Sequence, residues 1–236
     1  MSQRRVPAVF MRGGTSKGVF FHARDLPAGR EGWNAVFRAA LGSPDPYERQ
    51  LDGMGGGISS LSKAVVIAPS ERPGIDVDFT FAQVDVLSEL VDYSATCGNL
   101  SSAVGPFAID EGLVQPSDGE ALVRVYNTNT NKTFEARFPM AGAEAAVAGE
   151  FVIPGVAGSG ARIRLDFLDP GGAGTGHLLP SGCPLDVLDV PGLGPLRCSL
   201  IDSTNACVFV SAADVGLVGN ELPADLERRT EALDRL

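Results

Sequence analysis

Cys97 lies in a Cys-Gly-Asn turn, and an apolar run rich in Ala and Ser, residues 99–111, follows it at once. That run is apolar nearly all round, which predicts a buried helix that begins directly after the cysteine. A helix N-terminus favours the thiolate form of a cysteine, and its free N–H groups can hold a carboxylate. Because a free cysteine is more often inert core filling, these features alone leave acid–base chemistry and core packing open for Cys97.

Lysine is rare in this chain, and two of its three lysines occur in stretches rich in Gly, Ser and Thr. Lys17 lies in MRGGTSKG and Lys63 in GMGGGISSLSK. A surface lysine does not need such surroundings, although chance loop lysines are the alternative interpretation. The glycines allow backbone N–H groups to approach an anion closely, because glycine has no Cβ. Neither stretch has the spacing of a P-loop or of a dinucleotide-binding loop, so no nucleotide site is expected.

The acidity of the chain limits its partners. The 236 residues carry a formal net charge of −10, and the pI is about 4.7. Such a field repels nucleic acid and anionic membrane surfaces, and no apolar run approaches the length of a membrane span. We therefore expect no nucleic-acid partner and no membrane partner. A ligand that is itself an anion would need a local concentration of positive charge.

The remaining cysteines give no sign of a metal centre or a disulfide scaffold. Cys183, Cys198 and Cys207 form no CxxC pair, and no histidine lies at zinc-ligand spacing from them. We interpret all three as core residues, and His177 as a surface histidine. A cytoplasmic location, where thiols stay reduced, is the default expectation.

The first part of the chain alternates strand and helix signals. Short β-rich runs at 6–10 and 18–22 flank the first glycine loop and predict a strand–turn–strand unit. Residues 29–44 have apolar side chains on one helical face, with Gly42 near the expected end of the helix. Residues 62–70 predict a buried strand. Residues 75–86 alternate apolar and polar side chains, which predicts a strand with one buried face.

Further strand signals follow the helix after Cys97. Residues 121–140 contain an Asn/Thr turn and predict a hairpin, and residues 161–170 predict another strand. Residues 169–184 are dense in Gly and Pro and predict a linker. Beyond it, residues 185–212 predict strands, and residues 222–236 predict an amphipathic helix with no stop signal at its end.

Four stretches taken together resemble the PrpF family of isomerases of aconitate-type acids, which are relatives of diaminopimelate epimerase. They are MRGGTSKGVFF, GSPDPYERQLDGMGGGISSLSK, DVDFTFAQV and CGNLSSAVGPFAIDEGL. The resemblance is ordered along the first 114 residues and continues more weakly to about residue 220. It implies an α+β, diaminopimelate epimerase-like fold of two pseudo-symmetric domains. Each is a curved mixed or antiparallel sheet wrapped around a central helix, with the active site in the cleft between them.

The resemblance also sets the expected domains. Residues 1–180 would form the first epimerase-like domain, and residues 181–236 the start of the second. Because family members extend well beyond this length, we expect the second domain to be incomplete. The exposed half-cleft that results would favour self-association through apolar surface, and hence a homo-oligomer.

The chemistry that the resemblance implies needs neither metal nor cofactor. A proton moves along the allylic system of a small unsaturated di- or tricarboxylate such as 2-methylaconitate, with a net cis–trans change. Lys63 and Cys97 match the proposed acid–base pair of the family, and which of them takes the proton stays open. The motifs that line the carboxylate pocket of the family contain Arg12, Thr15, Ser16, Lys17, Gly98 and Asn99.

Alternatives remain at this point. A 4-oxalomesaconate tautomerase is the alternative enzyme, and an inactive fragment or accessory protein that binds an aconitate-like ligand is the alternative of another class. The chain has one cysteine in the matching turn, whereas epimerases of the superfamily use two, one from each domain; this favours isomerisation over racemisation. Asn205 is a candidate substrate contact from the second domain, with core packing or turn capping as its other interpretation.

Overall fold

The structure, a computed structural model, describes residues 3–115 and 118–233. It contains two compact units, residues 1–169 and residues 170–236. The domain boundary expected from the sequence at 180/181 lies within the second unit. The assignment of residues 1–180 and 181–236 to two epimerase-like domains stays a prediction.

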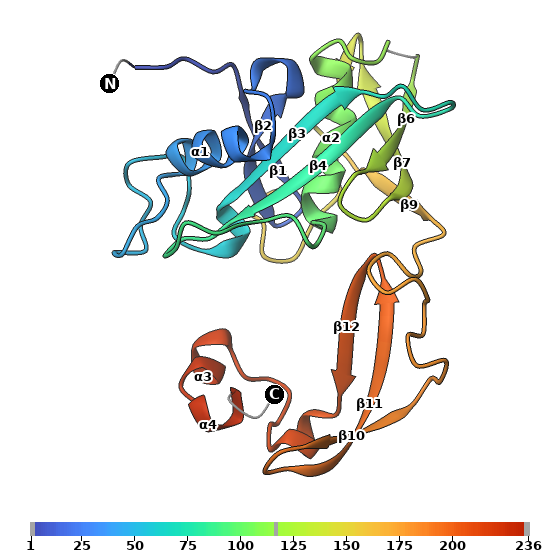
Figure 1. Cartoon of the computed structure of the whole chain (residues 1–236). Helices are drawn as coiled ribbons and strands as arrows, with labels where there is room; N and C mark the ends of the chain where they lie inside the picture. Colours follow the sequence, from blue (N-terminus) through green and yellow to red (C-terminus); the bar gives the residue numbers. More distant parts are fainter. Residues whose placement is uncertain (1–2, 116–117, 234–236) are drawn as a thin grey trace. The chain divides into compact units, whose positions relative to one another are not determined.

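Within the described residues of the first unit, nine strands form one curved mixed sheet (Figure 1). Its order is β1-β2-β3-β4-β6-β7-β8, with β5 paired to β4 and β9 paired to β7. The β2–β3 and β4–β6 pairs are parallel, and the other pairs are antiparallel. The strands are β1 (Val9–Gly13), β2 (Ser16–His22), β3 (Lys63–Pro69), β4 (Val77–Val84), β5 (Val91–Asp92), β6 (Glu120–Asn127), β7 (Lys132–Ala141), β8 (Glu144–Ala145) and β9 (Arg164–Leu168).

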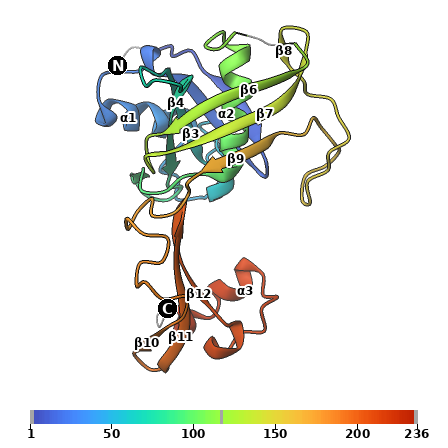
Figure 2. The same ribbon diagram turned by 90° about the vertical axis from the view of Figure 1, so that its right-hand side faces the viewer.

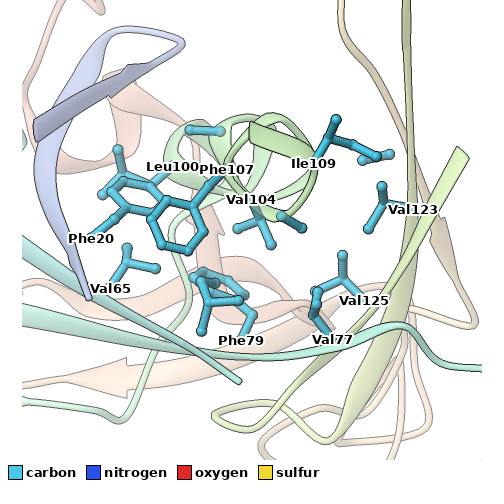
Figure 3. Close-up of a cluster of buried hydrophobic side chains, with 14 of the residues drawn as sticks. Phe20, Val65, Val77, Phe79, Leu100, Val104, Phe107, Ile109, Val123 and Val125 are labelled. Carbon is cyan, nitrogen blue, oxygen red and sulfur yellow. The ribbon is translucent and has the colours of Figure 1, made fainter. Parts of the chain in front are cut away.

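The sheet curves around one helix, α2 (Gly98–Asp110), which both ribbon views show in its interior (Figure 2). Most of this helix is buried, and side chains from β2, β3, β4 and β6 surround it (Figure 3). A Cβ at Gly105 would lie 2.5 Å from the Phe138 ring, so glycine allows the strand to approach the helix. The predicted helix that is apolar all round is therefore confirmed as the centre of the unit.

The second helix, α1 (Arg30–Leu41), packs on the opposite face of the same strands. Its Phe37 and Leu41 belong to a cluster with Val19 and Phe21 of β2. The helix ends at Gly42, whose φ of 76° is left-handed, as the sequence predicted. The sheet thus has a helix on each face.

The packing of a helix on each face of the sheet corrects one expectation. The alternation in residues 75–86 predicted a strand with one buried face, but β4 is buried on both. Phe79 and Phe81 face α2, while Ala82 and Val84 belong to the cluster on the α1 side. Ala82 and Val84 fill the part of that second face that belongs to the cluster with Phe37 and Leu41 of α1.

The second unit contains a three-stranded antiparallel sheet in the order β10-β11-β12, among the residues that the structure describes. The strands are β10 (Asp186–Val190), β11 (Gly194–Ser203) and β12 (Asn205–Val210). The single helix predicted over residues 222–236 is wrong: the chain forms α3 (Pro223–Glu227) and α4 (Thr230–Leu233), and residues 234–236 lie outside the described residues. No residue of α3 is buried, so little packing supports a longer helix there.

The three cysteines outside the turn differ in burial. Cys198 of β11 is buried, as expected for a core residue, whereas Cys183 and Cys207 are exposed. The core interpretation is wrong for these two, since Cys183 lies in a turn before β10 and Cys207 on the edge strand β12. His177 is exposed, as predicted.

None of the helices in the residues that the structure describes combines the length and the apolar character needed to cross a bilayer. No group of three or more His, Cys, Asp and Glu side chains is placed there to hold a metal ion.

Candidate active site at the N-terminus of the buried helix

The structure brings the two predicted acid–base residues together. Lys63 is the first residue of β3, and strand alternation places it on the α2 face with Val65 and Ile67. Cys97 is the N-cap residue of α2. Each residue is only 8% exposed, and the two side chains are close enough to hydrogen-bond. A buried amine and a buried thiol therefore meet at the first turn of the central helix.

Cys97 occupies a position where a helix normally has Ser, Thr, Asp or Asn. Its Sγ accepts a hydrogen bond from the Leu100 N–H at 3.5 Å, and its carbonyl accepts one from the Ser101 N–H at 3.0 Å. Sulfur is a weak acceptor, so a cysteine gives up part of the stabilisation that a hydroxyl or carboxylate cap would supply. Cys97 is therefore a weak cap, and it also belongs to the core cluster around α2, so its chemical role stays a prediction.

Burial lowers the pKa of Lys63 below its ordinary value of 10.5. The charge and hydrogen bond of Cys97 oppose part of this lowering. The Lys63 Nζ also lies 5.0 Å from the centre of the Phe81 ring. A lowered pKa increases the fraction of free amine near neutrality, which is the form that can accept a proton.

Sequence reasoning missed Gln83, whose Oε1 accepts a hydrogen bond from the Lys63 Nζ at 2.6 Å. A signal was present in the sequence. Gln83 continues the inward alternation of Val77, Phe79 and Phe81, so a polar side chain falls at a position that faces α2. A partly buried polar group at such a position is expected to have a partner, and here the partner is the candidate base.

The first glycine loop packs against the N-terminus of α2. A Cβ at Gly13 would lie 2.4 Å from the Asn99 carbonyl oxygen, so only glycine fits there without a shift. The Thr15 N–H donates to the Asn99 Oδ1 at 3.4 Å. The sequence suggested that these glycines bring backbone N–H groups to an anion; the contact in the structure is with the helix end instead.

The other predicted binding residues divide between the two faces of the hairpin. Ser16 is buried and lies on the α2 side with Phe20. Arg12 and Lys17 are cross-strand partners on the other face, by alternation along β2. The Lys17 Nζ lies 5.3 Å from the centre of the Phe10 ring. The hairpin therefore presents a hydroxyl toward the helix and two cations away from it.

A pocket of about 470 Å³ adjoins this hairpin. Its walls are residues of the hairpin, among them Arg12, Ser16 and Lys17, together with Leu61 and residues 155–157. Arg12 also donates to the Gly14 carbonyl at 2.8 Å. In a chain of net charge −10, this pocket has two positive side chains in its wall, which makes it a candidate for binding an anion.

Gly98 and Asn99 lie in the first turn of α2, and both are exposed. Asn205 lies in the second unit, where it begins β12 opposite Ser203 and is partly buried. The structure thus brings Lys63, Cys97 and Asn99 to one end of α2. The functional roles of all the candidate residues stay predictions.

The fold and the site define an α+β protein of the epimerase-like class. A solved structure of a probable proline racemase from Agrobacterium radiobacter is 12% identical, covers 90% of this chain and 54% of its own, and has a TM-score of 0.51; it shows the fold alone. The PrpF family, described as "PrpF protein", matches residues 3–236. The chain belongs to the PrpF family, and the predicted fold class is confirmed.

Other known proteins are much more similar. A 2-methyl-aconitate isomerase of Cupriavidus necator is 42% identical over 98% of this chain and 61% of its own length. A (4E)-oxalomesaconate Delta-isomerase of Novosphingobium is 44% identical over 95% of this chain and 61% of its own. A solved methylitaconate-delta-isomerase is 43% identical, with a TM-score of 0.77, over 99% of this chain and 60% of its own. The chain thus spans about three fifths of the length of these relatives.

Proposed function

We propose that this protein is an isomerase that shifts a proton along the allylic system of a small unsaturated di- or tricarboxylate such as 2-methylaconitate. The reaction has a net cis–trans outcome and uses neither metal nor cofactor. The observation that carries the proposal is the contact between the Lys63 amine and the Cys97 thiol at the N-terminus of α2. The relatives named as 2-methyl-aconitate and methylitaconate isomerases support the substrate class.

The proposed reaction needs one group that takes a proton and another that returns one. The free amine of Lys63 removes a proton from the carbon beside a double bond and a carboxylate. The electron pair of that C–H bond moves into the allylic system as the double bond shifts. The Cys97 thiol then donates a proton to the other end of the allylic unit, and the resulting ammonium and thiolate exchange a proton to restore the site. The lowered pKa of Lys63 supports its role as the base.

Negative charge builds on the substrate carboxylate during this step, so the site must stabilise an anion. The first N–H groups of α2, at Gly98 and Asn99, lie at the positive end of a 13-residue helix. Arg12 and Lys17, on the face of the hairpin away from α2, supply cations in the adjoining pocket, with Thr15 and Ser16 also in its wall. We propose that these groups bind the carboxylates, and that Asn205 contributes from the second unit.

A second candidate reaction uses the same site. A 4-oxalomesaconate-type tautomerase also moves a proton beside a carboxylate, and the relative named (4E)-oxalomesaconate Delta-isomerase favours it. Substrate trials distinguish the two.

We also propose the partners, location and assembly of the protein. A small anionic polycarboxylate is the partner, without nucleic acid or membrane, which the net charge of −10 supports. We place the protein in the cytoplasm, and we propose a homo-oligomer because apolar side chains such as Val208 and Phe209 of β12 are exposed.

Proton NMR in D₂O tests the proposal. The purified chain is incubated with cis- and trans-aconitate, 2-methylaconitate or 4-oxalomesaconate, and deuterium entering the allylic positions is measured. We expect exchange in the wild type, its loss in Lys63→Ala and a strong reduction in Cys97→Ser. Lys132→Ala is the matched control, since Lys132 belongs to β7 and pairs with Asp169.

Either of two results would overturn the proposal. A folded wild-type chain that exchanges none of these acids would be better explained as a binding or inactive protein. Full turnover in both Lys63→Ala and Cys97→Ser would show that the acid–base assignment is wrong.

A further inference from the structure

Gln83 lies directly opposite Lys63 in the antiparallel β3–β4 pair. Side chains at opposed positions point to the same face of a sheet, and their Cβ atoms lie about 5 Å apart. The Lys63 Nζ donates to the Gln83 Oε1 at 2.6 Å. The register of two strands therefore fixes an amide beside the candidate base.

The orientation of this amide is set by the groups on its other side. The Gln83 Nε2 donates to the Ser59 carbonyl at 3.0 Å and to the Ser62 carbonyl at 2.9 Å. Both N–H donors of the amide are thus used on groups that only accept. A flipped amide would place its oxygen against two carbonyls and its N–H groups against the Lys63 donors. The contacts therefore assign the oxygen to the Lys63 side.

An amide oxygen can only accept, so Gln83 binds an N–H of Lys63 in either protonation state of the amine. A neutral amine has two N–H bonds and one lone pair. With one N–H held by Gln83, the lone pair and the second N–H are confined to the side of Nζ away from Gln83. A carboxylate at this position would instead favour the ammonium form.

Among the other neighbours of Lys63, Asp92 and Phe81 do not hold an N–H of the amine as Gln83 does. Among the residues that the structure describes, Cys97 from α2 is the titratable group whose charge and hydrogen bond act on the amine. Asp92 of β5 lies opposite Gln83 in the sheet, but its carboxylate accepts from the Ser94 N–H at 2.8 Å and the Ser94 hydroxyl at 3.0 Å. The Phe81 ring supplies an uncharged neighbour.

We propose that Gln83 is a positioning residue, which holds one N–H of Lys63 and so directs the lone pair of the amine toward the substrate. This inference rests on the proposed function, and it adds a residue that acts through the base without touching the reacting atoms. It also explains why a glutamine sits on the inward face of β4 among apolar side chains.

Two substitutions separate the contacts of Gln83. Gln83→Met keeps a similar length but removes the acceptor and both donors. Gln83→Glu keeps an acceptor, adds a negative charge and removes both donors. Gln115→Met is the matched control, because Gln115 is exposed. Circular dichroism establishes that each variant is folded, and the second variant keeps the test open if the first does not fold.

A direct readout is the titration of Lys63 by NMR with lysine labelled at Cε. The chain has only three lysines, so Lys17→Arg and Lys132→Arg identify the Lys63 signal. We expect Gln83→Met to move the Lys63 titration to lower pH, because the ammonium loses an acceptor. We expect Gln83→Glu to move it to higher pH, and Gln115→Met to leave it in place.

The kinetic readout is the exchange reaction. Loss of a hydrogen bond to a charged group predicts that kcat falls about 10- to 100-fold in Gln83→Met, with little change in KM. The limb of the pH–rate profile that reports the base should move in the same direction as the Lys63 titration in each variant. A residue that merely supported the fold would lower activity without moving either curve.

The outcomes separate this inference from the proposed function. A Lys63 titration that is identical in Gln83→Met, Gln83→Glu and wild type overturns the inference, whether or not the chain is active. Full kcat and an unchanged pH profile in Gln83→Met also overturn it while the proposed function stands. Absence of exchange in the wild type overturns the proposed function, and the kinetic role of Gln83 falls with it; a moved titration then shows only that Gln83 contacts the amine.

Discussion

A basic side chain is buried at each end of α2, but the two side chains have different contact partners. At the N-terminus, Lys63 contacts an amide and a thiol. At the C-terminus, the His22 Nε2 lies 3.0 Å from a carboxylate oxygen of Glu111, and the imidazole packs on Phe107 at 5.1 Å between ring centres. Within the part of the chain that the structure describes, Lys63 forms no ion pair with a carboxylate, whereas His22 lies beside one.

The dipole of the helix explains why the position of a basic side chain along α2 matters. A positive side chain is favoured near the C-terminus of a helix and disfavoured near the N-terminus, where the exposed N–H groups favour anions. His22, which is positive only when protonated, lies at the end where such a charge is favoured. Lys63 opposes it and is buried as well, so its placement costs stability and suits chemistry. The comparison teaches that one helix anchors the fold at one end and holds the candidate catalytic pair at the other.

The largest expected effect separates the two ends by activity. Lys63→Met should lower allylic deuterium exchange by about 10²- to 10⁴-fold, because it removes the proposed general base. His22→Gln should leave the exchange rate per folded molecule unchanged, because His22 lies at the far end of the helix. Exchange assays normalised to folded protein measure both. Equal losses in the two variants would contradict the assignment of chemistry to the N-terminal end.

The next largest effect is on stability, and it concerns the β1–β2 hairpin, which packs against the N-terminus of α2. Gly13→Ala places a Cβ 2.4 Å from the Asn99 carbonyl and 2.9 Å from the Leu100 Cα, and backbone atoms cannot easily move aside. We expect the free energy of unfolding to fall by about 1–3 kcal/mol. Gly98→Ala is the control for stability, since a Cβ there meets nothing within 4 Å. Urea denaturation of both variants checks the difference, and equal stabilities would show that the hairpin packs less closely.

Much of this arrangement could be predicted from local patterns. The burial of α2 follows from a run that is apolar all round, and Gly42 marked the end of α1. Cys97 at the helix start was visible in the sequence. Its pairing with Lys63 came only from the family resemblance, because no spacing rule links a strand start to a distant helix cap.

The rest depends on register and packing between elements far apart in the chain. Gln83 meets Lys63 because β3 and β4 pair in one register, and His22 meets Glu111 because β2 ends beside the end of α2. Neither contact follows from local sequence. The burial of β4 on both faces was missed for the same reason, since it requires α1 to cover that sheet.

A smaller effect on stability is expected at the C-terminal end of α2, where His22 meets Glu111. His22 is buried, while the Glu111 side chain is 37% exposed. His22→Leu should lower the free energy of unfolding by about 1 kcal/mol, through loss of the hydrogen bond to Glu111 and of ring packing. Glu111→Gln should cost no more than about 1 kcal/mol, because its partner contact is partly solvated. Urea denaturation of the single and double variants measures both, and strictly additive losses would show that the two side chains do not interact.

The smallest effect is a pH dependence of stability at the active end. The pKa of Lys63 is lowered in the folded chain, whereas in the unfolded chain it returns to about its ordinary 10.5. Between the two values the unfolded chain binds a proton that the folded chain lacks, so stability rises with pH through that window. Below it, the cost of the buried ammonium is fully present. Lys63→Met should therefore stabilise the fold at lower pH, and this gain should shrink as pH rises toward 10.5. Lys132→Met, in an ion pair with Asp169, should show no such gain. Denaturation series across this range decide the point, and a gain that did not change with pH would mean that Lys63 is not the buried, titrating amine that distinguishes this end of α2.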